Sequence, residues 1–318
     1  MIELDMISFV IPCYGSEKTI EYVIDEIISV VSMKTNYDYE VITVNDSSPD
    51  KVLSVLKDIA EKNHKVKVID LAKNFGKHSA LMAGFSVAKG DYIVCLDDDG
   101  QCPMDRLWDL MEPLINDEAD YSMADYPEKK QSGFKNFGSS VNSLMSRVLL
   151  KKPKEIHFSN FCAMKRYIID EILKYENPYP YLEGLVLRTT NRIKTVQMEE
   201  RDRFAGKGNF GFIKSLSLWI NGFTAFSVVP LRASSLLGVL CAIIGFIYGL
   251  IVVIRKISLP DISVGWSSTI AIILFMGGVI MLILGLIGEY IGRIYISLNN
   301  SPQYVIRSSI NLDEDKDE

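Results

Sequence analysis

Three consecutive carboxylates follow an apolar stretch in the first third of the chain. Asp97, Asp98 and Asp99 come directly after the strand-like run 93–96. A folded core does not accommodate three adjacent acids, because buried unpaired charge is costly. Asp97 and Asp99, one residue apart, supply the hard oxygen ligands with which Mg²⁺ or Mn²⁺ holds a diphosphate. The alternative is an acidic turn that caps a helix starting near Pro103, so the surrounding elements must distinguish the two.

Strand and helix patterns alternate around this acidic run. Apolar runs predict strands at 7–12, 39–44, 66–71 and 91–96, and apolar residues at helical spacing predict helices at 19–31, 52–60 and 78–88. This order predicts an α/β fold with a mostly parallel sheet flanked by helices. Right-handed crossovers bring the carboxyl ends of parallel strands to one edge. The acidic run would therefore meet the loops 12–17, 45–50 and 73–77 at the edge where α/β sheets bind ligands.

Composition disfavours several classes of protein. The chain has 318 residues and a formal net charge of −6, and residues 313–318, with five acids and one lysine, carry −4 of it. The nearly neutral remainder argues against a nucleic-acid partner, and the acidic tail is typical of a disordered segment. Five scattered cysteines without a CxxC pair predict reduced thiols, and the acidic start lacks the basic region of a signal peptide. These features favour a location of both ends of the chain in the cytoplasm.

Two long uncharged stretches occupy the C-terminal third. Residues 233–254 and 262–288 contain no charged side chain, and each exceeds the about 20 residues that cross a bilayer as a helix. We predict transmembrane helices at 234–254 and 264–288, with two buried core helices as the alternative. The aromatic, amphipathic segment 212–233 predicts either a helix in the membrane interface or an ordinary domain helix.

Other nucleotide and catalytic motifs are misplaced or absent. Residues 206–211 match G-x-G-x-x-G, but they lie far from the first strand, and no acid occurs between Asp202 and Asp261. A dinucleotide site is therefore not predicted. The sequence contains no Walker A, GxSxG or HExxH motif, and its three histidines do not cluster.

Six segments occur in the order and spacing of one known family. They are IPCYGSE at 11–17, VNDSSPD at 44–50, NFGK with ALMAG at 74–84, DDDGQCP at 97–103, RFAGKG at 203–208 and PLR at 230–232. The chain resembles family 2 glycosyltransferases of GT-A fold. Within them it is similar to the polyprenyl-phosphate glycosyltransferases, which include bactoprenol glucosyltransferases, undecaprenyl-phosphate formamido-arabinose transferases and dolichol-phosphate mannose synthase. The resemblance runs from residue 7 to about residue 295.

The resemblance implies a Rossmann-like sheet, two transmembrane helices and a nucleotide-sugar site. Pro12, Tyr14, Glu17 and Asp46 match the positions that hold the nucleotide base and ribose. We assign two further residues to the same site, Asp98 and Gln101.

The resemblance also implies how the reaction is catalysed. Asp97 and Asp99 match the ligands of a divalent ion, Mg²⁺ or Mn²⁺, which offsets the charge of the departing nucleoside diphosphate. Arg201, Arg203 and Lys207 form a basic cluster that could grip a phosphate, with Arg203 counted as catalytic. The alternative is that this cluster belongs to a solvated surface loop.

Some positions depart from the family pattern. Asn160 stands where relatives carry an Asp, and Asn45 replaces the first Asp of a DDGS segment. A lipid phosphate is anionic near neutral pH, because its second pKa is about 6. It needs positioning and positive charge more than a general base, so the lack of a carboxylate at Asn160 is compatible with that acceptor.

We therefore predict an inverting glycosyltransferase that moves one sugar from a nucleotide-diphosphate donor to undecaprenyl phosphate. UDP is the preferred prediction for the nucleotide of the donor, and the product would serve the modification of a cell-envelope glycan. It would be a multi-pass protein of the cytoplasmic membrane and a homo-oligomer such as a tetramer. The predicted parts are a catalytic domain at 1–211, the segment 212–233, the two spans, and a cytoplasmic segment at 289–318 with an acidic tail. The alternatives are transfer to a hydroxyl of a lipid-linked glycan and a non-catalytic membrane scaffold.

Overall fold

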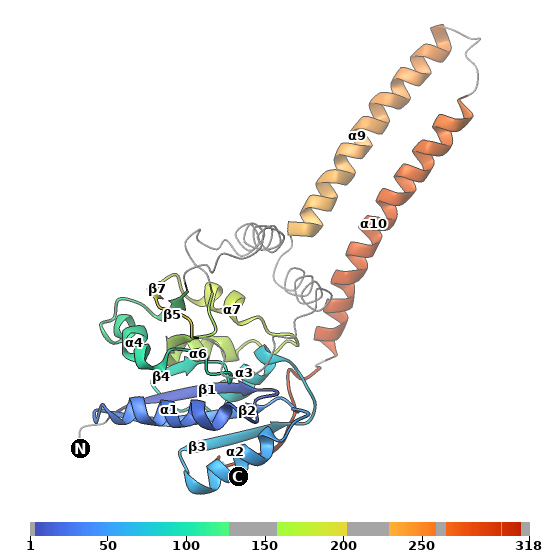
Figure 1. Ribbon diagram of the computed structural model, residues 1–318. Coiled ribbons are helices and arrows are strands. Elements are labelled where there is room, and N and C mark those ends of the chain that lie inside the picture. The colour runs from blue at the N-terminus through green and yellow to red at the C-terminus, as the bar shows by residue number, and fades with distance from the viewer. Residues whose placement is uncertain (1–3, 127–157, 202–228, 259–264, 300, 313–318) are drawn as a thin grey trace. The chain divides into compact units, whose positions relative to one another are not determined.

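The computed structural model describes residues 4–126, 158–201, 229–258, 265–299 and 301–312. The chain divides into two units. The first consists of Met1–Phe210 with Asn300–Glu318, and the second is Gly211–Asn299. The first unit holds the sheet and its helices, and the second holds two long helices (Figure 1).

The first unit is built on an eight-stranded mixed sheet with the order β7-β5-β6-β4-β1-β2-β3-β8. Its strands are β1 (Asp5–Cys13), β2 (Tyr37–Asn45), β3 (Val66–Leu71), β4 (Tyr92–Cys95), β5 (Tyr121–Asp125), β6 (Cys162–Lys165), β7 (Ile193–Gln197) and β8 (Ile306–Ile310). Parallel pairs join β1 to β2 and β4, β2 to β3, and β5 to β7. Antiparallel pairs join β6 to β4 and β5, and β8 to β3. The predicted parallel β1–β4 sheet is confirmed, and the complete sheet is mixed.

Helices alternate with the strands and cover both faces of the sheet (Figure 1). They are α1 (Ile20–Ser32), α2 (Val52–Lys62), α3 (Lys77–Phe85), the short 3₁₀ helix η1 (Met104–Arg106), α4 (Leu107–Ile115), α6 (Arg166–Leu173) and α7 (Leu182–Thr189). Their boundaries fall within a few residues of the predicted ones in the region 19–88.

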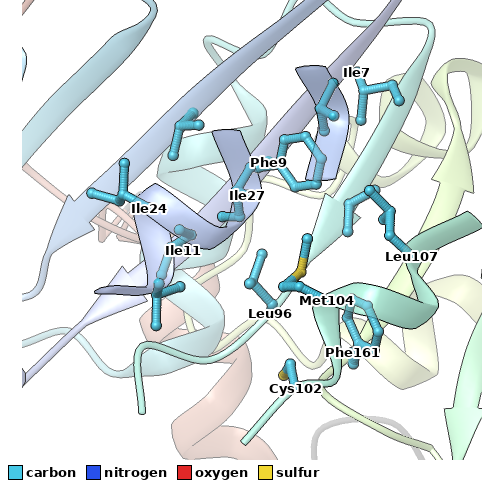
Figure 2. Close-up of a cluster of buried hydrophobic side chains, with 14 of the residues drawn as sticks. Ile7, Phe9, Ile11, Ile24, Ile27, Leu96, Cys102, Met104, Leu107 and Phe161 are labelled. Atoms are coloured by element: carbon cyan, nitrogen blue, oxygen red, sulfur yellow. The ribbon is translucent and has the colours of Figure 1, made fainter. Parts of the chain in front are cut away.

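The core of this unit follows from strand alternation and helix periodicity. Ile7, Phe9 and Ile11 project from one face of β1 and are fully buried. They pack with Ile24 and Ile27, which share one face of α1 (Figure 2). On the other face of the sheet α3 approaches β1 closely: a Cβ on Gly84 would lie 2.3 Å from Val10 Cγ1. The two helix layers hold the central strands, and therefore their carboxyl ends, in fixed positions.

The second unit contains α9 (Val229–Ser258) and α10 (Trp266–Leu298), which lie side by side (Figure 1). Within the described residues one segment, Phe275–Gly292 of α10, is long and apolar enough to cross a membrane. It overlaps the predicted span 264–288. The region of the other predicted span, 234–254, contains the shorter apolar stretch Gly238–Tyr248, so its assignment as a span stays a prediction.

The chain returns to the sheet after α10. β8 pairs with β3 at the sheet edge, which the expected C-terminal segment 289–318 did not include. Most of the predicted interfacial segment 212–233 lies outside the described residues, as does the acidic tail 313–318.

Candidate functional site

The carboxyl ends of β1 to β4 meet at one edge of the sheet because these strands are parallel. β6 is antiparallel to β4, so the residues that precede it, 158–161, lie at the same edge. The carboxyl ends of β5 and β7 lie at this edge as well. The topology therefore brings together seven segments that are distant in sequence.

Asp97 occupies the centre of this edge, directly after β4. One of its carboxylate oxygens accepts a hydrogen bond from the Lys77 ammonium at the start of α3. The other oxygen accepts a hydrogen bond of 2.7 Å from Asn160 Nδ2. An Asp at position 160 would place two carboxylates against each other, whereas the amide donates. Lys77 and Asn160 thus orient Asp97 and balance part of its charge.

Asp98 points into the protein and supports the neighbouring loop. Its carboxylate accepts a hydrogen bond of 2.9 Å from the backbone N–H of Tyr14, and its carbonyl accepts one of 2.6 Å from Thr19 Oγ1. Burial raises the pKa of Asp98 to about 6, since desolvation disfavours the charged form. The structure thus gives Asp98 a role in holding the loop after β1.

Asp99 and Gln101 join the β4 loop to the segment after β7. Asp99 Oδ1 accepts a hydrogen bond of 3.1 Å from the Gln101 N–H. The Gln101 amide donates to Glu200 Oε1 at 3.3 Å and to the Arg201 carbonyl at 3.2 Å, and the Arg201 N–H donates to the Gln101 carbonyl at 3.1 Å. Gln101 is therefore a bridge between two sides of the site.

The loops after β1 and β2 interlock. The Glu17 N–H donates to Asp50 Oδ2 at 2.9 Å, and Glu17 Oε2 accepts from the Lys51 N–H at 3.0 Å. The Gly15 N–H donates to Ser48 Oγ at 2.8 Å. Tyr14 is 55% exposed beside them. This arrangement leaves an aromatic ring at the surface of a rigid pair of loops.

Asp46 is buried and fixes the turn that leads into α3. Its two oxygens accept hydrogen bonds of 2.7 Å and 2.9 Å from the backbone N–H groups of Phe75 and Gly76. Gly76 has a φ of 89°, a conformation that favours glycine. Asp46 thereby sets the start of α3, and with it Lys77, although it was predicted to contact the nucleotide.

An open cleft of about 520 Å³ lies beside Asp97. Its polar lining comes chiefly from Asp97, Gln101, Asp125, Tyr126, Asn160 and Glu200. Burial raises the pKa of the Tyr126 hydroxyl, which stays protonated at neutral pH. Asp125, Tyr126 and Glu200 are not among the site residues predicted from the sequence. The signal that could have found them is their position at the carboxyl end of β5 and shortly after β7.

The predicted basic cluster is described only in part. The Arg201 guanidinium donates to Glu26 of α1 at 2.6 Å and to Asp105 of η1. It lines a second cleft of about 500 Å³, beside Arg106, rather than the cleft at Asp97. Both acidic partners already engage Arg201, so the structure does not support its predicted role as a free phosphate ligand. Arg203 and Lys207 lie outside the described residues.

The acidic edge fits a divalent ion that is shared with a substrate. Among the residues with described positions, no group of three His, Cys, Asp or Glu side chains could hold a metal by itself. Mg²⁺, however, is usually bound by one or two carboxylates together with substrate phosphates. A carboxylate has about four lone-pair positions, so the two hydrogen bonds on Asp97 leave room for another ligand. Asp97 and Asp99 are the carboxylates that would coordinate such an ion.

Comparison with solved structures defines the class of fold. Glucosyl-3-phosphoglycerate synthase from Mycobacterium tuberculosis, in complex with Mn²⁺ and UDP-glucose, matches with a TM-score of 0.53 and 20% sequence identity. The match covers 69% of this chain and 77% of that chain. The first unit therefore has a GT-A fold, a Rossmann-like mixed sheet flanked by helices.

Sequence comparison then gives the family. Residues 8–173 match glycosyl transferase family 2, and residues 229–294 match the GtrB C-terminal hairpin. The chain belongs to glycosyl transferase family 2, which confirms the predicted resemblance.

Relatives match over nearly the whole chain. The uncharacterized glycosyltransferase YkcC of Bacillus subtilis (strain 168) is 31% identical over 309 residues, which are 96% of this chain and 94% of the relative. The SfII prophage-derived bactoprenol glucosyl transferase of Shigella flexneri is 29% identical over 305 residues, which are 95% of this chain and 98% of the relative. The relatedness therefore includes the helical hairpin.

Proposed function

We propose that this family 2 enzyme transfers one sugar from a nucleotide-diphosphate donor, a UDP-sugar, to polyprenyl phosphate at the cytoplasmic face of the membrane. The observation that carries the proposal is the combination, in one chain, of a carboxylate-lined cleft and an apolar hairpin. The bactoprenol glucosyl transferase relatives support a lipid carrier. The UDP-glucose complex of the structural neighbour supports a nucleotide-sugar donor.

The donor would lie across the carboxyl ends of β1 to β4. The base and ribose would rest against Pro12, Tyr14 and Glu17, where the interlocked loops leave the Tyr14 ring exposed. Asp46 and Asp98 would act indirectly, because their carboxylates hold the backbone of the surrounding loops. The diphosphate would then reach Asp97 and Asp99.

A Mg²⁺ or Mn²⁺ ion held by Asp97 and Asp99 would supply Lewis-acid stabilisation of the departing diphosphate. Lys77, which donates to Asp97, provides a second positive charge at the same point. Gln101 keeps the acidic loop against the segment after β7. These residues orient the donor so that its anomeric carbon faces the cleft.

The acceptor phosphate would enter from the cleft side and attack the anomeric carbon directly, which inverts its configuration. It needs no proton removed, because the phosphate is already anionic at neutral pH. Asn160 is neutral and donates a hydrogen bond to Asp97. A neutral side chain at this position suits an anionic nucleophile, because a carboxylate there would repel it. Arg203 and Lys207 are proposed to grip the acceptor phosphate, since Arg201 is engaged by Glu26 and Asp105.

The membrane arrangement is the remaining part of the proposal. Spans at 234–254 and 264–288 would leave both flanks in the cytoplasm, with the catalytic domain 1–211 on that side. The apolar window Phe275–Gly292 supports the second span, and the match to a GtrB C-terminal hairpin supports a paired arrangement. The two proposed spans contain glycines and no charged residue, which is compatible with close helix packing in a homo-oligomer.

The test is a panel of labelled UDP-sugars given to the purified enzyme with undecaprenyl phosphate and Mn²⁺. One sugar should be transferred by the wild type. Asp99→Ala should lower kcat at least about 100-fold, the scale on which single electrostatic groups act in catalysis. The control is Asp109→Ala, which removes an acid of α4 that pairs with Arg106 at the surface and should change kcat less than about twofold. Full activity of Asp99→Ala would contradict the metal assignment.

A further inference from the structure

The C-terminal strand is linked to the loops of the donor site through a series of hydrogen-bonded polar groups, of which Asp70 and Asn45 are buried. β8 (Ile306–Ile310) pairs with β3, and the register shifts between Asp70 and Leu71. Ser308 lies opposite Asp70 and Ile306 opposite Leu71, so Arg307 is the extra residue of a β-bulge. Bulges redirect a side chain and bend an edge strand. Here the bulge turns Arg307 toward the carboxyl end of β3.

Arg307 reaches a buried carboxylate. Its Nη1 donates to Asp70 Oδ2 at 3.3 Å, and its Nη2 donates to the Ala72 carbonyl at 2.6 Å. The Asp70 side chain is 4% exposed. A buried carboxylate is costly unless it is paired and hydrogen-bonded, so Arg307 supplies a charge that Asp70 requires.

Asp70 in turn holds the last residue of β2. Asn45 Nδ2 donates to Asp70 Oδ1 at 2.7 Å, and the two residues are opposite each other in the parallel register of β2 and β3. Asn45 Oδ1 accepts the Ser48 N–H at 3.2 Å. An Asp at position 45 would face Asp70 with a like charge, which explains why an amide fits here.

Ser48 completes the connection to the loop after β1. Its hydroxyl accepts the Gly15 N–H at 2.8 Å and donates to Asp50 Oδ1 at 2.6 Å. Ser47, just before it, has a φ of 51°, a conformation that non-glycine residues keep only when their surroundings impose it. The contacts from Asn45 and Ser48 hold this conformation in place.

We infer that Arg307 is a positioning residue for the nucleotide donor, acting through Asp70, Asn45 and Ser48 on the loops that precede Glu17 and Lys51. The inference rests on the proposed function, because it assumes that those loops receive the nucleotide. In this proposal β8 contributes to donor binding in addition to pairing with β3 at the edge of the sheet.

Donor kinetics test this assignment. Arg307→Ala should raise the KM for the UDP-sugar about tenfold, the scale of coupling between residues in one hydrogen-bonded network. The kcat and the KM for undecaprenyl phosphate should change less than about twofold. Arg307→Lys keeps the charge but not both hydrogen bonds, so its donor KM should lie between those of Arg307→Ala and the wild type. The double variant Asp70→Asn/Arg307→Ala removes the charge that needs a partner and should bring the donor KM back toward the wild-type value.

Arg166→Ala is a matched control. Arg166 on α6 likewise donates to one carboxylate, that of Asp170 at 2.9 Å, and to one backbone carbonyl, that of Ala88. It touches none of the loops in the Arg307 connection. If Arg307→Ala behaves like Arg166→Ala, or if kcat and both KM values change together with thermal stability, the positioning role is contradicted.

Hydrogen exchange separates failure of this inference from failure of the proposed function. In the ligand-free protein, Arg307→Ala should speed amide exchange in peptides covering residues 14–18 and 46–51, whereas Arg166→Ala should not. This readout does not require the enzyme to bind any nucleotide. Unchanged exchange overturns the inference and leaves the proposed function standing, whereas changed exchange in a protein that binds no UDP overturns the proposed function and, with it, the assignment of Arg307 to the donor.

Discussion

Phe9 of β1 and Phe275 of α10 are the same residue type in opposite surroundings. Phe9 is fully buried among side chains of the first unit, whereas Phe275 is 63% exposed. The contrast extends to their neighbours: Ile7 and Ile11 are fully buried, while Ile273 is 63% exposed. The first unit thus provides its own apolar interior. The hairpin presents its apolar side chains outward, a distribution typical of a surface meant for lipid or for another protein.

The largest effect expected from this contrast concerns the two phenylalanines. Phe9→Ala should lower the free energy of unfolding of the first unit by about 3–5 kcal/mol, the usual cost of a large cavity in a core. Phe275→Ala should change it by less than about 1 kcal/mol. Urea denaturation of the detergent-solubilised protein, followed by circular dichroism, measures both. Equal losses would mean that the two units share one core, contrary to the comparison.

Two helical glycines offer a second, smaller test. A Cβ on Gly84 of α3 would lie 2.3 Å from Val10 Cγ1, whereas a Cβ on Gly277 of α10 would have nothing within 4 Å. Gly84→Ala should cost about 1–3 kcal/mol of stability through overpacking. Gly277→Ala should be neutral or slightly stabilising, since alanine favours helix by up to about 1 kcal/mol.

The same glycine pair also probes the surroundings of the hairpin. Size-exclusion chromatography with light scattering of both variants reports on the oligomer. If Gly277→Ala breaks an assembly that Gly84→Ala leaves intact, the face of α10 that bears Gly277 packs against another copy instead of lipid.

The smallest expected effect on stability comes from a charged pair at the surface of the first unit. The predicted spans of the second unit contain no charged residue and therefore no such pair. A hydrogen bond from Lys65 holds the pKa of Asp38 below its ordinary value. The pair therefore stabilises the folded state above the unfolded-chain pKa of about 3.9, and this contribution is lost as the pH falls through the lower folded-state pKa. Both side chains are 47% exposed, so the contribution is below about 1 kcal/mol. Denaturation of wild type and Asp38→Asn at pH 7 and pH 3 should show the difference shrinking at the lower pH.

Local patterns predicted much of the first unit. The strands and helices of the region 7–96 could be read from the sequence because each buries one periodic face against a shared core. The parallel order then placed Asp97 at the correct edge. β8 was missed because its sequence, IRSSI, has apolar residues only at its two ends and no alternating pattern. Its partner β3 also lies far away in sequence.

The roles of individual site residues were less predictable. Asp98 resembles its neighbours in sequence, yet its side chain supports Tyr14 because the turn directs it inward. Arg201 pairs with Glu26, which is 175 residues away, and no local pattern encodes such a contact. Asp46 holds two backbone N–H groups of the turn before α3, a contact visible only once β2 and β3 lie side by side.

We propose that the acceptor is a lipid phosphate, and analysis of the reaction product distinguishes it from a hydroxyl acceptor. The purified wild type would receive the active UDP-sugar with Mn²⁺ and either undecaprenyl phosphate or undecaprenol, followed by mass spectrometry of the lipids before and after mild acid. One sugar should be added to undecaprenyl phosphate alone, through a linkage that mild acid breaks. Transfer to the hydroxyl acceptor alone, with an acid-stable product, would contradict it.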